Sequence, residues 1–317
     1  MPLYVNVPID DPSMHNQTQL LDVDDETFNH SFDPKKPSAF VRFYRLICFI
    51  VFLGPIKFVV CISSFIIFYM MLWVLPIFRR FFKNNIDFKK WAAKVTYPAI
   101  RMILFGAGVI HMKVNGEFKE DTRTVVTNHL TGLDAASLFL TVPCQFLATA
   151  GARNNTLCYR GSLVFDMIYV DRTKAEGVTK QIGDAQNDPT RLPVAIFPEG
   201  RVTNGSCTIG FRSGAFVADT PVQPIAIRYK HWLMPESMAT IAWCEWNFLL
   251  YVYQLFSVPF YTLEVTILDQ MVNKNSEKKP DERAKEAELA IANYLGCPAL
   301  SKTNKGTLTG RPKEKKE

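Results

Sequence analysis

His129 and Asp134 are the pair of side chains in this sequence whose types and spacing best suit proton transfer. His129 follows the apolar run 124–127, and Asp134 comes five positions later, after a turn that contains Gly132. An aspartate at a helix start can bond one imidazole nitrogen, which fixes the tautomer and leaves the other nitrogen to accept a proton. We therefore predict that His129 is a general base and that Asp134 orients it. The competing interpretation is a structural histidine in a polar turn.

A second group of polar residues suits the binding of phosphate. The sequence IFPEGRVTNGS places Glu199, Gly200 and Arg201 directly after the apolar run 194–197. A cation beside backbone N–H groups on a glycine-containing turn can hold a phosphate. Arg172 ends another apolar run, in the tetrapeptide Tyr-Val-Asp-Arg. The alternative for each arginine is an ordinary solvated surface charge.

The sequence does not indicate several other kinds of site. It has no glycine-rich nucleotide loop, no Gly-x-Ser-x-Gly elbow and no Cys, His and carboxylate cluster with metal-ligand spacing. We expect neither a metal nor a cofactor. The seven cysteines form no Cys-x-x-Cys pair and are odd in number, which favours a reducing compartment. The net charge of +6 is too small to indicate nucleic acid, but it suits an anionic membrane surface or a phosphate-bearing substrate.

Short apolar runs alternate with helical patterns, and this order predicts an α/β fold. The runs are rich in β-branched residues and lie at 109–114, 124–127, 145–149, 194–197, 222–227 and 263–268. Helical patterns cover 91–105, 134–140, 173–188 and 281–295. Alternation of this kind predicts a parallel or mixed sheet that is covered by helices. In such a sheet, His129 and Glu199 both lie at strand ends, where α/β folds position functional groups.

The uncharged stretch 58–78 predicts attachment to a membrane. A helix over these residues would span roughly 30 Å, the thickness of the hydrocarbon core. Five basic residues between 79 and 90 follow it and favour the cytosol for that side. Three more between 42 and 57 precede it, and Gly54-Pro55 offers a break that would turn the region into a hairpin with both ends in the cytosol. One span and a re-entrant hairpin both stay open, and a buried core helix is the remaining alternative.

Composition divides the chain into four regions. Residues 1–38 are acidic and rich in proline, and residues 298–317 are basic and poor in apolar side chains, so we expect both to be disordered. Residues 39–83 form the membrane anchor and residues 84–297 the α/β domain. Within that domain, 241–261 carries aromatic residues typical of the membrane–water interface. We expect a helix that lies on or dips into the bilayer there; an ordinary core helix is the alternative.

Four motifs, taken in order, resemble those of the glycerolipid acyltransferase superfamily. Residues 128–134 match NHxxxxD and residues 197–200 match FPEG, the first and third motifs of that family. Residues 169–172 look like its second motif and residues 221–224 like its fourth. The resemblance covers roughly residues 100–270.

Within that superfamily, the segments 53–58 and 203–216 look most like lysophosphatidylcholine acyltransferases and their close relatives. The third motif departs from its usual form, because Arg201 and Val202 stand where a threonine more often follows FPEG. This departure leaves the head-group preference open.

The resemblance implies transfer of an acyl chain from acyl-CoA, as co-substrate, to the free hydroxyl of a lysophospholipid. His129, oriented by Asp134, would take the proton of that hydroxyl. One alternative is lysophosphatidic acid or glycerol 3-phosphate as acceptor; another is a non-catalytic, membrane-anchored protein of lipid droplets. The residues that we expect to bind substrate are Asn128, Arg172, Glu199, Gly200 and Arg201.

Lys313 and Lys315 resemble the K-x-K-x-x signal by which membrane proteins are retrieved to the endoplasmic reticulum. We therefore expect retrieval machinery as a partner, the endoplasmic reticulum membrane as the location and a catalytic domain that faces the cytosol. An ordinary solvated basic tail is the alternative for the two lysines, and a lipid droplet is the alternative location. Asn16 and Asn29 each begin a glycosylation sequon, so they report which side of the membrane the N-terminal region occupies.

Overall fold

The computed structural model describes residues 16–34, 37–170, 175–234, 241–244, 247–273 and 277–304. Its centre is a seven-stranded sheet in the order β1-β7-β6-β2-β5-β3-β4. Neighbouring strands are parallel except β6 and β7, which are antiparallel. The predicted mixed α/β fold is therefore confirmed. The strands are β1 (Val109–Asn115), β2 (Thr124–Thr127), β3 (Gln145–Thr149), β4 (Met167–Val170), β5 (Val194–Ile196), β6 (Val222–Trp232) and β7 (Phe260–Ile267).

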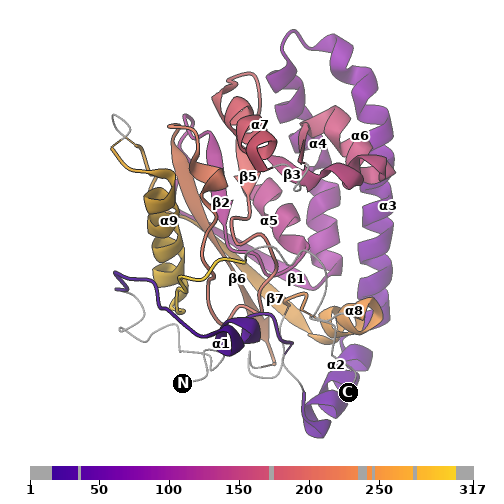
Figure 1. Cartoon of the computed structure of the whole chain (residues 1–317). Coiled ribbons are helices and arrows are strands. Elements are labelled where there is room, and N and C mark those ends of the chain that lie inside the picture. The colour runs from indigo at the N-terminus through magenta and orange to yellow at the C-terminus, as the bar shows by residue number, and fades with distance from the viewer. Residues whose placement is uncertain are drawn as a thin grey trace.

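Helices cover both faces of the sheet, which explains why its central strands are continuously apolar. Val125 packs in a core on one face and Val126 in a separate core on the other, because successive strand residues point to opposite sides. Helices α4 (Asn85–Gly106) and α5 (Leu133–Thr141) lie over the first face. Helices α7 (Ala175–Asn187) and α9 (Pro280–Leu295) lie over the second (Figure 1).

Two elements of the domain are absent from the sequence expectation. Strand β4 is an edge strand that pairs only with β3 among the described strands, and its four residues alternate between half-buried and buried. Helix α6 (Thr156–Phe165) precedes it and is capped by the Asn155 side chain, which accepts hydrogen bonds from the N–H groups of Leu157 and Cys158. Both elements are short, and neither carries the long apolar pattern that the sequence analysis relied on.

The expectation that residues 1–38 and 298–317 are disordered is wrong for residues 16–34 and 298–304. Helix α1 (Asp25–His30) belongs to the first segment, and Phe28 and Phe32 pack with Ile209 and Leu300 in a small third core. The two segments also pair with each other, since the Leu21 N–H donates to the carbonyl of Ala299 at 2.8 Å. Net charge and proline content predicted disorder here because they do not take account of these few buried apolar side chains. Residues 1–15, 35–36 and 305–317 lie outside the described part of the chain.

The predicted anchor consists of helix α2 (Ala39–Val51), helix α3 (Gly54–Phe78) and the short η1 (Arg79–Phe81). Leu53, with a φ of 57°, separates α2 from α3, so a break at Gly54-Pro55 is present. However, α2 leads away from the end of α3 and does not run back alongside it (Figure 1). The chain reverses after η1 instead, and α4 returns antiparallel to α3.

Helices α3 and α4 touch at both ends of this pair. A Cβ atom on Gly106, at the end of α4, would lie 2.4 Å from the backbone nitrogen of Cys61 near the start of α3. At the other end, the rings of Phe78 and Trp91 lie 5.5 Å apart. Because α4 is part of the domain core, α3 is attached to the domain along its length.

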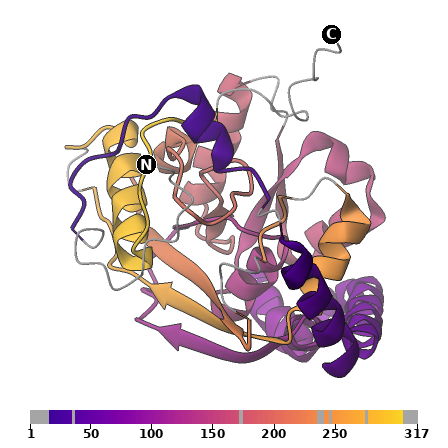
Figure 2. The same cartoon turned by 90° about the horizontal axis from the view of Figure 1, so that it is seen from below.

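An apolar surface joins α2, α3 and α8 (Phe248–Ser257), which lie together on one side of the molecule (Figures 1 and 2). Within the described residues, the stretch Gly54–Phe81 is the one helical segment long and apolar enough to cross a membrane, and 17% of its most apolar window is buried. The aromatic segment predicted at 241–261 contains α8, which is shorter than expected. The large apolar side chains exposed on these helices include Phe40, Phe43, Ile47, Ile50, Val59, Ile66, Met70, Phe248, Leu249 and Leu250.

Candidate active site

His129 and Asp134 lie together at the carboxyl end of β2, as their spacing predicts. The Nδ1 atom of His129 is 3.0 Å from Oδ2 of Asp134. The carboxylate is fully buried, whereas 21% of the imidazole is exposed. Within the described residues, Nε2, the second imidazole nitrogen, forms no hydrogen bond. The pair therefore has the geometry of a base held by an aspartate, with one nitrogen left to exchange a proton.

Four donors converge on the Asp134 carboxylate. The backbone N–H groups of Leu130 and Thr131 donate to Oδ2 at 2.6 and 2.8 Å, beside His129, and the Tyr229 hydroxyl donates to Oδ1 at 2.9 Å. Such bonding stabilises an ionised buried carboxylate. Burial and the nearby Asp134 raise the pKa of Tyr229 well above its ordinary value, so the phenol keeps its proton and remains a donor.

Asn128 is next to His129, but its contacts differ from the predicted role in substrate binding. Its side-chain amide donates to the carbonyl of Ile227 at 2.9 Å, and its side-chain oxygen accepts from the N–H of Ile227 at the same distance. Only 4% of Asn128 is exposed. The residue ties the end of β2 to β6, and so it fixes the backbone from which His129 projects.

The turn after β5 forms the other wall of the site, because β2 and β5 are parallel neighbours that end at the same edge of the sheet. The ring of Phe197 stacks on His129, with 4.1 Å between centroids and 24° between planes. The N–H of Thr203 donates to the carbonyl of His129 at 2.9 Å. The turn after β5 therefore lies directly against His129.

Glu199 is buried beneath this turn and does not project into solvent. Its exposure is 0%, and neither carboxylate oxygen makes a well-formed hydrogen bond within the described residues. Burial and the neighbouring Glu288 of α9 raise its pKa well above the ordinary value, while the backbone of His129 and the side chain of Thr203 act in the opposite direction. A neutral carboxyl group is therefore favoured, and the role of Glu199 in substrate binding stays a prediction.

Gly200 is required by the shape of the turn and by a neighbouring cation. Its φ is +69°, and an added Cβ atom would lie 2.9 Å from the guanidinium carbon of Arg212. Arg212 thus brings a second positive charge to the turn that carries Arg201. The guanidinium carbon of Arg201 lies 4.3 Å from the centroid of the Phe32 ring, and Phe32 belongs to the N-terminal segment. The predicted contact at Arg172 lies outside the described residues.

Three residues of this site escaped the sequence analysis. Tyr229 occupies a buried position of β6 where an apolar residue would fit the pattern. Its hydroxyl at such a position could have indicated a buried hydrogen-bond partner. Phe197 belongs to the motif that was recognised, but nothing in the sequence places it against His129. Thr203 joins the two halves of the site through its backbone, which no side-chain pattern reveals. Within the described residues, no group of three or more His, Cys, Asp and Glu side chains is arranged to hold a metal ion.

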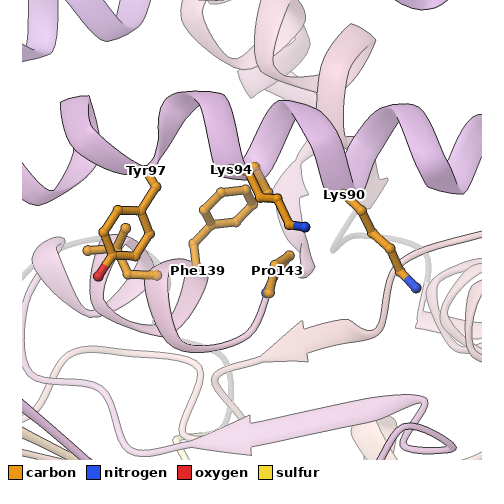
Figure 3. Close-up of a pocket in the computed structure, with 7 residues that line it drawn as sticks. Lys90, Lys94, Tyr97, Phe139 and Pro143 are labelled. Carbon is orange, nitrogen blue, oxygen red and sulfur yellow. The ribbon is translucent and has the colours of Figure 1, made fainter. Parts of the chain in front are cut away.

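A separate pocket of about 310 Å³ lies between α4 and the end of α5 (Figure 3). Its floor is apolar, and two lysines of α4 stand at its edge. None of the residues predicted to act in catalysis or substrate binding lines it. The residues that line it are Lys90, Ala93, Lys94, Tyr97, Phe139, Leu140 and Pro143.

Comparison with known proteins identifies similarities that cover this site. Residues 112–228, which contain His129, Asp134 and Glu199, match the family model described as Acyltransferase. Lysophosphatidylcholine acyltransferase 2B of Rattus norvegicus is 26% identical over 274 residues, which cover 80% of this chain and 51% of the rat protein.

Two further similarities span most of the chain. The lipid droplet-regulating VLDL assembly factor AUP1 homolog of Caenorhabditis elegans is 24% identical over 71% of this chain and 57% of its own length. The crystal structure of the 1-acyl-sn-glycerophosphate (LPA) acyltransferase PlsC from Thermotoga maritima covers 74% of this chain and 96% of its own, with 16% identity and a TM-score of 0.48. This chain spans about half the length of the curated relatives described above.

Proposed function

The chain belongs to the glycerolipid acyltransferase superfamily, and we propose that it transfers an acyl chain from acyl-CoA to the free hydroxyl of a membrane lysophospholipid. The observation that carries this proposal is the His129–Asp134 pair at the strand edge, in which a fully buried carboxylate bonds Nδ1 of an imidazole that is 21% exposed. The similarity to a lysophosphatidylcholine acyltransferase supports lysophosphatidylcholine as the first acceptor to test.

In the proposed reaction, Nε2 of His129 takes the proton of the acceptor hydroxyl as its oxygen attacks the thioester carbonyl of acyl-CoA. The tetrahedral intermediate then collapses, the C–S bond breaks and CoA leaves as a thiol with the proton returned by the imidazolium. Asp134 holds the ring and stabilises its positive charge between the two steps. No acyl-enzyme is required, because both substrates bind beside the same base.

The oxyanion of that intermediate needs hydrogen-bond donors, and the structure restricts where they come from. The N–H groups of Leu130 and Thr131 are committed to Asp134, and the N–H of Thr203 is committed to His129. The N–H of Gly200 donates to the carbonyl of Phe197. These four groups are therefore excluded, and a donor must come from elsewhere at the site or from a rearrangement on binding.

Arg201 and Arg212 are the described cations beside the turn after β5, and we assign them to the phosphate of the acceptor. Guanidinium groups form charge-assisted, bidentate bonds with phosphate. Arg172 stays a proposal from the motif alone. Glu199 has a different role in this account: a buried neutral carboxyl beneath the turn supports its shape and does not contact the acceptor.

The apolar surface of α2, α3 and α8 supports attachment to a membrane. Residues 16–34 pack on the same domain as the active site, through bonds such as Asn204 N–H to the carbonyl of Ser31 at 2.7 Å. A single crossing by α3 would put these residues and the domain on opposite sides of the bilayer. We therefore propose that α2 and α3 insert into one leaflet without crossing the bilayer, which differs both from one span and from a hairpin that folds α2 back along α3.

The endoplasmic reticulum, with the domain in the cytosol, remains the proposed location. The lysines of the retrieval signal, Lys313 and Lys315, lie outside the described residues. The Lys57 ammonium donates to the carbonyls of Val258 and Pro259, so one basic residue beside the anchor is satisfied by the domain. This removes part of the charge penalty of inserting the anchor.

The test is an acyl-CoA transfer assay with the purified chain and three acceptors: lysophosphatidylcholine, lysophosphatidic acid and glycerol 3-phosphate. We expect the highest kcat/KM with lysophosphatidylcholine. A higher kcat/KM with either of the other two would change the proposed acceptor but leave the proposed acyl-transfer reaction unchanged. No transfer to any of the three would refute the enzymatic proposal and favour the non-catalytic alternative.

A further inference from the structure

The N-terminal residues 16–34 form part of the wall around the candidate active site. Asn204, three residues after Arg201, is bound to this segment in three ways. Its backbone N–H donates to the carbonyl of Ser31 at 2.7 Å, and its side-chain amide donates to the carbonyls of His30 and Asp33 at 2.7 and 3.2 Å. Only 6% of Asn204 is exposed. The loop after the FPEG turn is thus fixed to the N-terminal segment by a buried residue.

The same loop is fixed to the catalytic histidine from its other side. The N–H of Thr203 donates to the carbonyl of His129, and the neighbouring N–H of Asn204 donates to Ser31. Two consecutive backbone groups therefore connect His129 to the N-terminal segment. A shift of that segment would be transmitted to the loop that Arg201 begins.

Phe32 makes a direct contact with Arg201. The guanidinium carbon lies 4.3 Å from the centroid of the Phe32 ring, within the range of a cation–π interaction. Phe32 is itself held, since it is 9% exposed and packs edge-to-face on Phe28 with centroids 5.4 Å apart. Phe28 in turn packs beneath the Lys302 ammonium, 5.7 Å away. The ring under Arg201 is therefore a fixed surface.

We propose that Phe32 is a positioning residue, which holds the Arg201 guanidinium in place for the anionic group of the acyl acceptor. The inference rests on the proposed function, because it takes Arg201 as a contact of the acceptor phosphate. An arginine that is already ordered loses less conformational entropy when it binds an anion. Loss of the ring should therefore weaken binding of the acceptor and leave binding of the acyl donor unchanged.

The test compares three full-length variants in steady-state transfer assays. Phe32→Leu keeps an apolar side chain but removes the π face, Phe32→Tyr keeps the ring, and Phe28→Leu loosens the same segment without contact to Arg201. We expect Phe32→Leu to raise the KM for the lysophospholipid about 2- to 30-fold, the range of a cation–π contact, without a matching rise in the KM for acyl-CoA. Phe32→Tyr should stay near the wild-type value.

A double variant completes the test. In an Arg201→Ala background, Phe32→Leu should have little further effect on the acceptor KM, because both changes remove one interaction. The inference is overturned if Phe28→Leu raises the acceptor KM as much as Phe32→Leu does, or if Phe32→Leu raises the KM values of both substrates equally. It is also overturned if the effects of Phe32→Leu and Arg201→Ala on the acceptor KM are additive. It also falls if wild type transfers to no acceptor, but that result refutes the proposed function first; transfer with an unchanged acceptor KM in Phe32→Leu refutes the inference alone.

Discussion

The Asp134 carboxylate is held by more groups than orientation of a histidine requires. Two backbone N–H groups and the Tyr229 hydroxyl join His129 on its two oxygens. Removal of Asp134 would leave several buried donors without an acceptor, so an alanine at this position would disturb folding as well as catalysis. The contribution of the carboxylate is better tested through its neighbours.

Tyr229→Phe removes one donor and little volume. We expect the free energy of unfolding to fall by about 1–3 kcal/mol, because a buried hydrogen bond to a charged group is lost. The Tyr229 hydroxyl also helps to hold the carboxylate that orients His129, so kcat/KM should fall by more than the loss of folded protein explains. A folded variant with the kcat/KM of wild type would show that Tyr229 does not act on the pair.

Glu288 lies beneath the site in α9 and gives a second prediction at this scale. Burial raises its pKa from 4.5 to about 8, although the Phe211 N–H and the Thr208 hydroxyl favour the ionised form. Between pH 4.5 and 8 the folded state keeps a proton on Glu288 that the unfolded chain has lost. The free energy of unfolding is therefore highest below pH 4.5 and falls as the pH rises to 8, by up to about 1.4 kcal/mol per pH unit.

Glu288→Gln should flatten that decline, which urea unfolding at pH 5, 6, 7 and 8 would measure. Glu286→Gln is the matched control, since Glu286 is on the same helix and is partly exposed beside Lys278. If Glu288→Gln leaves the slope as steep as in wild type or in the control, the buried carboxyl is not the group responsible.

Residue types and spacing were enough to predict the His129–Asp134 pair, because an aspartate five positions after a histidine bonds it through local turn geometry. The role of Asn128 was not predictable in this way, since its partner Ile227 is 99 positions away. The burial of Glu199 was not predictable for a similar reason: it depends on α9, which follows Glu199 by more than 80 residues. Side-chain identity indicates a chemical capacity, whereas long-range packing decides whether solvent or substrate reaches it.

At the scale of elements, the apolar runs predicted the strands of the sheet well, apart from the edge strand β4. Continuous runs of β-branched residues favour strands in a sheet whose two faces are both covered by helices.

The pairing of α3 with α4 was harder to predict from the sequence. Gly54-Pro55 offered a strong local signal for a reversal, yet the chain reverses after Phe81, where α4 can pack its apolar side on both α3 and the sheet.

Helix α8 provides the test of the membrane surface at this scale. Leu249 and Leu250 are 76% and 52% exposed at its first turn. A Leu249→Ser, Leu250→Ser double variant should partition about 10-fold or more less strongly into neutral phosphatidylcholine vesicles from dilute detergent, because two leucines no longer insert. Lys285→Ser on α9 is the control. Equal partition of the double variant and wild type would place α8 away from the bilayer.

For the whole molecule, the contacts of residues 16–34 bear on the proposed topology. The Gln17 side chain accepts from the N–H of Ala299, and the N–H of Asn204 donates to Ser31, so the proposed membrane attachment leaves this segment and the domain on one side of the bilayer. We therefore expect Asn16 and Asn29 to carry no glycan. A glycosidase-sensitive mobility shift, lost in the Asn16→Gln, Asn29→Gln double variant, would contradict the arrangement of α2 and α3 proposed above.

Acyl transfer by His129→Ala beside wild type, with lysophosphatidylcholine and acyl-CoA, tests whether His129 is the general base. His129 is partly exposed, so its truncation should leave the circular dichroism spectrum and thermal midpoint close to those of wild type. We predict that kcat falls by about 100- to 10,000-fold, the contribution of a general base, with both KM values changed little. A folded His129→Ala variant that keeps more than half of the wild-type rate would show that His129 is not the general base.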